Sequence, residues 1–173
     1  MTKESKERSE LLAAIPQEFR HLATATILFH QAIADRLGMH LTDHKCGDIL
    51  VQTGPITAGE LAERTGLTTG AITGVIDRLE KAGFVRRAKD PDDRRRVIIE
   101  PLPERIKGQV APLFQSIGRA IAGMCARYNT RELAAIREFI AGFNQLTYEE
   151  VTNLREGSSQ AKPDRRSRPT ARK

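Results

Sequence analysis

The fold is decided by residues 54–103, which read GPITAGELAERTGLTTGAITGVIDRLEKAGFVRRAKDPDDRRRVIIEPLP. Within this stretch, Thr57 and Glu60 have the spacing of a capping box, in which a hydroxyl and a carboxylate each satisfy an unpaired backbone N–H at a helix start. Gly66 suits the left-handed position at which such a helix ends. The stretch therefore begins with a short helix and a tight turn.

A second helix is predicted directly after this turn. Thr68 is a suitable N-cap residue, and Gly83 is a suitable C-terminal stop. One face is apolar, because side chains at i, i+3, i+4 and i+7 face the same way: Ile72, Val75, Ile76 and Leu79. The opposite face holds only small or polar residues: Thr69, Gly70, Thr73, Gly74 and Asp77. Such a slim surface can approach base edges closely.

Beyond Gly83 the pattern changes from helical to extended. Residues 84–89 and 95–100 predict two strands, the second rich in β-branched residues. Residues 90–93, with the sequence DPDD, supply turn chemistry between them. Six basic residues oppose three aspartates in this hairpin: Arg86, Arg87, Lys89, Arg94, Arg95 and Arg96. An exposed hairpin of this charge suits contact with phosphates or with a DNA minor groove.

Two helices followed by a basic hairpin make a winged helix-turn-helix, and the stretch resembles the DNA-binding core of the MarR family of bacterial transcription regulators. The resemblance rests on ELAERTGL at 60–67, IDRLEKAGFVRR at 76–87 and DPDDRR at 90–95. Upstream, LTDHKCGDIL at 41–50 is similar to the family's lead-in helix, for which Thr42 is the expected N-cap. These motifs cover about a third of the chain.

The expected fold class is mainly α with a small β-hairpin wing. The winged helix-turn-helix is expected over residues 41–102, with N- and C-terminal dimerisation helices over 9–40 and 103–156. Pro16 predicts a bend in the first flanking region and Pro112 a kink in the second. Further along, Asn129 and Glu132 predict a second capping box and a helix running to about Arg155. A small winged helix cannot cover so much apolar helix surface, so self-association is the economical explanation.

The terminal segments carry few apolar residues. Residues 157–173 hold six basic residues and one aspartate, which account for most of the net charge of +6. We expect residues 1–8 and 157–173 to be disordered, because such segments cannot bury enough apolar surface to offset their ordering entropy. The tail is interpreted either as a nonspecific phosphate-binding arm or as a solubilising segment.

The resemblance implies a symmetric dimer on double-stranded DNA, with two recognition helices in successive major grooves of a pseudo-palindromic operator. The candidate contacts from the recognition helix are Thr68, Thr69, Gly70, Thr73 and Arg78. Two alternatives stay open, since Thr68 is equally suited to a purely capping role and Arg78 to pairing with a wing carboxylate. On the wing, the candidates are Arg86, Arg94 and Arg95, whereas Arg96 is expected to be an ordinary solvated side chain.

Family members often bind small aromatic acids in a crevice between the dimer helices and the winged helix. The corresponding search region here is Phe19, His21, Phe29, His30 and His40, although apolar residues on helices are usually core. The expected function is therefore a dimeric, sequence-specific transcriptional regulator, interpreted as a repressor that a small aromatic effector releases from DNA.

Other classes fit less well. Cys46 and Cys125 have no CxxC spacing, and both are expected to be buried as small hydrophobes, so a redox sensor remains an alternative only. No three-ligand cluster is evident among His40, His44, Asp43 and Asp48. The sequence therefore predicts no metal site or cofactor, and metal sensing stays another alternative. No catalytic motif indicates an enzyme. The sequence predicts no membrane span and a cytoplasmic protein. A winged helix used to dock an acidic protein partner is the alternative from a different class.

Overall fold

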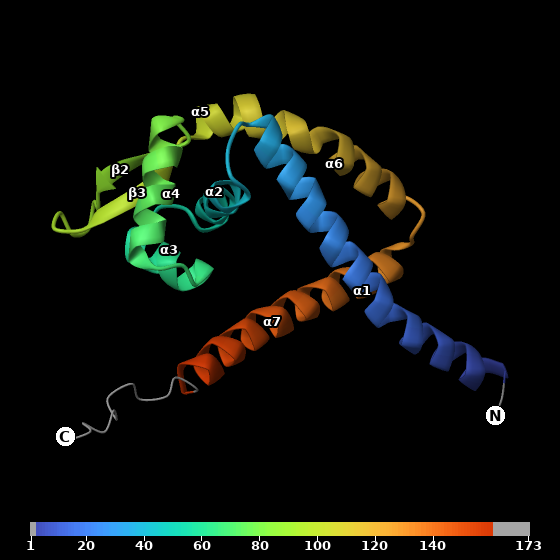
Figure 1. The fold of residues 1–173 in the computed structure, drawn as a ribbon. Helices are drawn as coiled ribbons and strands as arrows, with labels where there is room; N and C mark the ends of the chain where they lie inside the picture. The colour runs from blue at the N-terminus through green and yellow to red at the C-terminus, as the bar shows by residue number, and fades with distance from the viewer. Residues whose placement is uncertain (1–2, 161–173) are drawn as a thin grey trace, which may run out of the picture. The chain divides into compact units, whose positions relative to one another are not determined.

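The computed structural model describes residues 3–160 (Figure 1). These residues fold as two units that divide after Ser116. The first unit contains the winged helix. Its elements are α1 (Lys3–Arg36), α2 (Leu41–Thr53), β1 (Ile56–Thr57), α3 (Ala58–Thr65), α4 (Thr69–Lys81), β2 (Val85–Lys89), β3 (Val97–Pro101), α5 (Pro103–Arg105), the π-helical turn η1 (Ile106–Val110) and the first part of α6 (Ala111–Cys125). The second unit contains the rest of α6 and α7 (Thr130–Gln160).

The sheet is small and antiparallel, with strand order β1-β3-β2. β2 and β3 form the predicted hairpin, in which Arg87 pairs with Ile99 and Lys89 with Val97. β3 begins at Val97, two residues later than predicted, because residues 94–96 still belong to the turn. The strand β1 was not predicted from the sequence, because it is only two residues long; it pairs Ile56 with Ile99. This third strand fixes the base of the hairpin against the start of α3.

The core of the first unit lies where α2, α3 and α4 pack on the sheet. All four apolar residues predicted for the inner face of α4 are buried, with Ile72 fully so. They pack with Leu50 of α2, Leu61 of α3 and Ile99 of β3. Burying such side chains contributes roughly 1.5–3 kcal/mol each, so this cluster holds α4 with its opposite face outward.

Local signals confirm the predicted start and end of the two central helices. In the capping box of α3, the Glu60 backbone N–H donates to the Thr57 hydroxyl at 3.2 Å, and the Thr57 backbone N–H donates to the Glu60 carboxylate at 2.7 Å. Gly66 ends α3 with a φ of 72°, the left-handed region that only glycine enters at little cost. Thr68 caps α4 by accepting from the Ala71 backbone N–H at 3.3 Å.

Two predictions about helix starts were wrong. The first helix begins at Lys3, so residues 3–8 are helical rather than disordered. This segment is rich in good helix formers, and Lys6 pairs with Glu10 one turn later at 3.8 Å. The lead-in helix α2 begins at Leu41 with His40 at the N-cap position, and the His40 side chain makes no capping hydrogen bond. Thr42 therefore lies inside the first turn of α2 and is not its cap.

The prolines in the flanking helices act differently from one another. Pro16 lies within α1, which continues on both sides of it. Before Pro112, the chain forms the π-helical turn η1, which a helix can adopt where proline removes a backbone donor. The wider turn therefore lies between α5 and α6, directly before the position at which the sequence predicted a kink.

The last helix starts as predicted and ends later. Asn129 accepts from the Glu132 backbone N–H at 3.1 Å, and its own backbone N–H donates to the Glu132 carboxylate at 2.7 Å. α7 continues to Gln160, so residues 157–160 are helical, whereas the rest of the predicted disordered tail lies outside the described residues. None of the described helices is both long enough and apolar enough to cross a lipid bilayer.

Candidate DNA-binding surface and ligand pocket

The outward face of α4 is exposed and narrow. Thr68, Thr69, Gly70 and Thr73 are all exposed, and a methyl group added at Gly70 would meet nothing within 4 Å among the described residues. The Thr73 hydroxyl donates to the Thr69 carbonyl at 2.9 Å, which leaves its methyl group and an oxygen lone pair to the outside. Thr68 uses its oxygen for the helix cap. This face can therefore approach a base-pair edge without displacing any bulky side chain.

Arg78, the fifth candidate residue on α4, forms an ion pair with another residue of the same chain. Its Nε and Nη2 atoms donate to the two carboxylate oxygens of Asp43, each at 2.7 Å. Asp43 is 2% exposed on α2, whereas the Arg78 side chain is half exposed. This pairing raises the pKa of Arg78. From the sequence, an internal pair between Arg78 and a carboxylate of the wing was left open. That partner was wrong, because Arg78 pairs with Asp43 and so joins α4 to α2.

The tip of the hairpin presents Arg94 and Arg95. Two aspartates shape the turn, since Asp90 accepts from the Asp92 backbone N–H at 2.9 Å and Asp93 accepts from the Arg95 backbone N–H at 3.0 Å. Both arginines are exposed. None of the ion pairs among the described residues includes either guanidinium. Their charges are therefore available to an anion outside the protein.

The other arginines of the hairpin serve the fold. Arg86 donates to Glu100 on the opposite strand at 2.6 Å. Arg87 bridges the hairpin to α4, where it contacts Asp77 at 2.5 Å and also Glu80. These two guanidinium groups are neutralised by internal carboxylates, so Arg86 is less available to DNA than the two arginines of the tip.

Arg96 is exposed, as the sequence predicted, but it also has two acidic neighbours that the sequence did not reveal. It lies 3.4 Å from Glu60 at the start of α3 and 3.8 Å from Asp90 in the turn. The partner could not be seen in the sequence, because Glu60 reaches Arg96 only after β3 has paired with β1. Arg96 ties the base of the hairpin tip to the capping box of α3.

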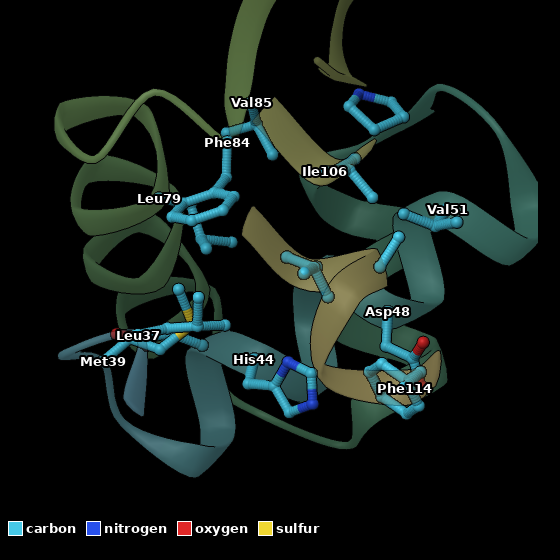
Figure 2. Close-up of a pocket in the computed structure, with 15 residues that line it drawn as sticks. Leu37, Met39, His44, Asp48, Val51, Leu79, Phe84, Val85, Ile106 and Phe114 are labelled. Carbon is cyan, nitrogen blue, oxygen red and sulfur yellow. The ribbon is translucent and has the colours of Figure 1, made fainter. Parts of the chain in front are cut away.

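An apolar pocket of about 250 Å³ lies in the first unit, beside α2 (Figure 2). Most of its walls are hydrocarbon, and Figure 2 shows Phe84 and Val85 at one end with Phe114 and Asp48 at the other. The fifteen lining residues are Leu37, Met39, Asp43, His44, Gly47, Asp48, Val51, Leu79, Phe84, Val85, Pro101, Ile106, Val110, Ala111 and Phe114. The pocket touches α4 through Leu79, so it adjoins the helix whose outer face is the candidate DNA surface.

The predicted search region for a ligand does not line this pocket. Phe29 and His30 lie behind it, since Phe29 packs edge-on against Phe114 with ring centroids 5.5 Å apart. His30 is within 3.0 Å of His44, nitrogen to nitrogen. Burial lowers the pKa of both histidines, so both favour the neutral form. Two of the five predicted residues thus support the wall from behind.

The remaining search residues lie elsewhere. His21 is exposed on α1, 3.7 Å from Glu18, and Phe19 is half-buried on the same helix. His40 borders a shallow hollow beside α4, together with Thr42 and Gly70. None of the three lines the apolar pocket. Most of the residues that line it come from α2 and from the segment after β3.

The two cysteines differ in environment. Cys46 is buried as predicted, and burial, followed by the nearby Asp43 carboxylate, raises the pKa of its thiol to about 11. Cys125 is exposed, so the expectation that it is buried was wrong for the chain by itself. A raised pKa keeps Cys46 in the unreactive thiol form. Among the described residues, no group of three or more His, Cys, Asp or Glu side chains could hold a metal ion.

Comparison with known proteins places this arrangement in a family. The model of the MarR family matches residues 41–97. The uncharacterized HTH-type transcriptional regulator YcgE of Bacillus subtilis is 46% identical over 149 residues, which cover 86% of this chain and 96% of the relative. The chain belongs to the MarR family. A MarR-family chain of this kind is a transcriptional regulator with a DNA-binding winged helix-turn-helix.

Solved structures agree with the fold of this MarR-family regulator. A MarR family protein from Bacillus stearothermophilus superposes with a TM-score of 0.63 at 19% identity, over 80% of this chain and 96% of that one. The MarR protein from Peptoclostridium difficile gives a TM-score of 0.58 at 16% identity, over 82% and 92% of the two chains. At these identities the likeness concerns the fold alone.

Some residues of the candidate surface and pocket were not identified from the sequence. Asp43 did carry a signal, because it is a lone acidic residue on the buried side of α2, three residues before Cys46, and such a carboxylate requires a partner. Phe84 and Phe114 stand among apolar residues and look like ordinary core in the sequence. Only the folded chain brings them to opposite ends of one pocket.

Proposed function

We propose that this MarR-family regulator binds a pseudo-palindromic operator as a homodimer and represses transcription until a small molecule binds it. In this proposal α4 enters the major groove, and the hairpin tip reaches the adjacent minor groove. A dimer lying over promoter DNA blocks polymerase without any further contact, which favours repression.

The observation that carries the DNA-binding proposal is the contrast between the arginines of the hairpin. Arg94 and Arg95 are exposed at the tip and outside every described ion pair, whereas Arg86, Arg87 and Arg96 are bound to carboxylates. Charges that the protein leaves unneutralised can displace counterions from DNA phosphates. The tip is therefore the part of the hairpin that we expect to gain most from a nucleic-acid partner.

The homodimer is supported by exposed apolar side chains on helices of both units. On α1, Leu22 is 59% exposed and Leu28 64% exposed. On α7, Phe139 is 54% exposed. Soluble monomers rarely leave such apolar surfaces open to water, and burying them contributes about 25 cal/mol per Å². The proposed assignment of residues 9–40 and 103–156 to dimerisation rests on these faces.

The test of DNA binding uses the duplex upstream of the protein's own gene. We expect a two-fold symmetric footprint and an affinity that falls steeply with salt. The R94A/R95A variant should bind more weakly, and the slope of log K against log salt should become shallower by about 0.9 for each phosphate that is no longer neutralised. Its melting temperature and oligomeric state should stay nearly unchanged, because neither side chain forms an ion pair with any residue between 3 and 160.

The R94K/R95K variant serves as the matched control. Lysine keeps the charge and lacks the planar fork, so most of the salt dependence should return while the discrimination between sequences falls. An R94A/R95A variant with the affinity of the unmodified protein would show that the hairpin tip is passive. Absence of any protected palindrome, together with binding to an acidic protein, would favour the protein-docking alternative.

A further inference from the structure

We infer that the apolar pocket beside α2 selects an aromatic or aliphatic amine, and that it disfavours the small aromatic acids expected from the family resemblance. This inference rests on the proposed effector-relieved function and names the chemical class of the effector. It is based on the charges that face the pocket and on how each of them is already paired.

Negative charge prevails among the polar groups that line the pocket. They are Asp43, His44 and Asp48, and the fifteen lining residues include no lysine or arginine. Asp43 is fully engaged, because both of its oxygens accept from Arg78 at 2.7 Å. It therefore contributes almost no net charge to the pocket.

Asp48 is the carboxylate that remains for a ligand. It pairs with the Lys45 ammonium at 3.6 Å on the same helix. The Lys45 side chain is 43% exposed and that of Asp48 is 31% exposed, so this is a loose pair that water screens. Aspartate oxygens can accept further hydrogen bonds from an ammonium group while the lysine stays in place.

His44 offers no compensating positive charge. Burial lowers its pKa, and the ring of His30 lies within hydrogen-bonding distance of its Nε2 atom, at 3.0 Å. A neutral imidazole donates one hydrogen bond and accepts one, and it carries no charge that could neutralise a carboxylate ligand. An aromatic acid in this pocket would meet no cationic side chain among the fifteen lining residues, so burying its charge there is costly.

The rest of the pocket fits an apolar body of one or two rings. Its volume of about 250 Å³ is just below the range of about 300–1,000 Å³ that is usual for drug-sized ligands. Phe114 lies at the same end as Asp48 (Figure 2). An ammonium group beside Asp48 would therefore lie at the end of the pocket that holds this aromatic ring, and aromatic rings attract cations.

The experiment compares three probes with one ring system: 2-naphthylmethylamine, 2-naphthalenemethanol and 2-naphthoate. Binding to the full-length protein is measured by calorimetry without DNA, and release of the operator duplex is measured separately. We expect the amine to bind on the order of tenfold more tightly than the acid, with the alcohol between them. The D48N variant should reduce this difference to about twofold, and K45Q should increase it, because Asp48 then lacks its own cation.

D35N is the matched control, since Asp35 is an exposed residue of α1 that bonds to Gln31 and does not line the pocket. It should leave the order of the three probes unchanged. Tighter binding of the acid than the amine, or an unchanged preference in D48N, would overturn the inference while leaving effector control intact. Failure of all three probes to bind would overturn it as well. Binding of the amine without any release of DNA would instead refute the proposed effector function and leave the ligand class standing.

Discussion

The bond between Arg78 and Asp43 makes a specific prediction about stability. We expect the R78A variant to fold with a free energy of unfolding lower by about 3 kcal/mol. Removing one partner of a buried ion pair usually costs about 3–5 kcal/mol, because the other charge is left without compensation. Asp43 is 2% exposed, so its carboxylate would be left buried without a partner. Arg78 is half exposed, so the loss of its own contacts lowers the free energy of unfolding by less. The lower end of that range therefore applies.

The assay is urea unfolding at fixed protein concentration, supported by thermal melting. For a chain of this size, about 3 kcal/mol corresponds to a fall in melting temperature of roughly 6–12 °C. The R94A variant is the matched control, and it should stay within about 0.5 kcal/mol of the unmodified protein, because Arg94 forms no ion pair with the residues that the structure describes. The D43N/R78M double variant should be destabilised by less than the sum of the two single changes, because the double change strands no charge.

The same variant separates an anchoring role from a DNA contact. If Arg78 mainly holds α4 against α2, R78A leaves the salt dependence of DNA binding almost unchanged at temperatures where the variant is folded. If Arg78 contacts a phosphate, the slope of log K against log salt becomes shallower by about 0.9 per contact. Unchanged stability together with a shallower slope would refute the anchoring role of Arg78.

The remaining predictions concern α4, the cysteines and the histidine pair. G74A should raise the free energy of unfolding by up to about 1 kcal/mol, measured in urea, because alanine is the better helix former and the added methyl meets only an arginine side-chain nitrogen at 3.4 Å among the described atoms. Native alkylation followed by mass spectrometry should label Cys125 before Cys46, because a pKa of about 11 leaves roughly one Cys46 thiol in a thousand ionised at pH 8; equal rates would contradict this, and urea should abolish the difference. The pKa values of His30 and His44 are lower in the folded protein than in the unfolded chain, so just below pH 6.5 the unfolded chain binds more protons than the folded protein does. The free energy of unfolding is therefore unaffected by these two groups above that pH and falls as the pH drops further. H30Q/H44Q should flatten this dependence of the urea midpoint between about pH 7.5 and 5, and an equally steep dependence in that variant would assign it to other groups.

Features that depend on neighbouring residues could be predicted from the sequence. The capping box of Thr57 and Glu60 involves a single helical turn, and the inner face of α4 follows from helical periodicity alone. The basic hairpin was likewise evident, because turn chemistry and β-branched residues follow one another within a short stretch. In each case the determining contacts lie within a few residues of one another.

Features that depend on distant contacts could not be predicted. Arg78 and Asp43 are 35 residues apart, and only the packing of α4 on α2 decides that they meet. The apolar pocket takes walls from α2, α4 and η1, so no single stretch carries its pattern. Exposure of Cys125 likewise depends on what covers α6, and helical periodicity does not reveal this.

The carboxylate of Glu60 links the start of α3 to the hairpin. It accepts from the backbone and hydroxyl of Thr57 at the start of α3, and it also receives Arg96 from the hairpin. A glutamine at this position would still cap the helix but would attract the arginine much less. We therefore expect positions 60 and 96 to vary together among close relatives, because a change at either one loosens the contact between the start of α3 and the hairpin.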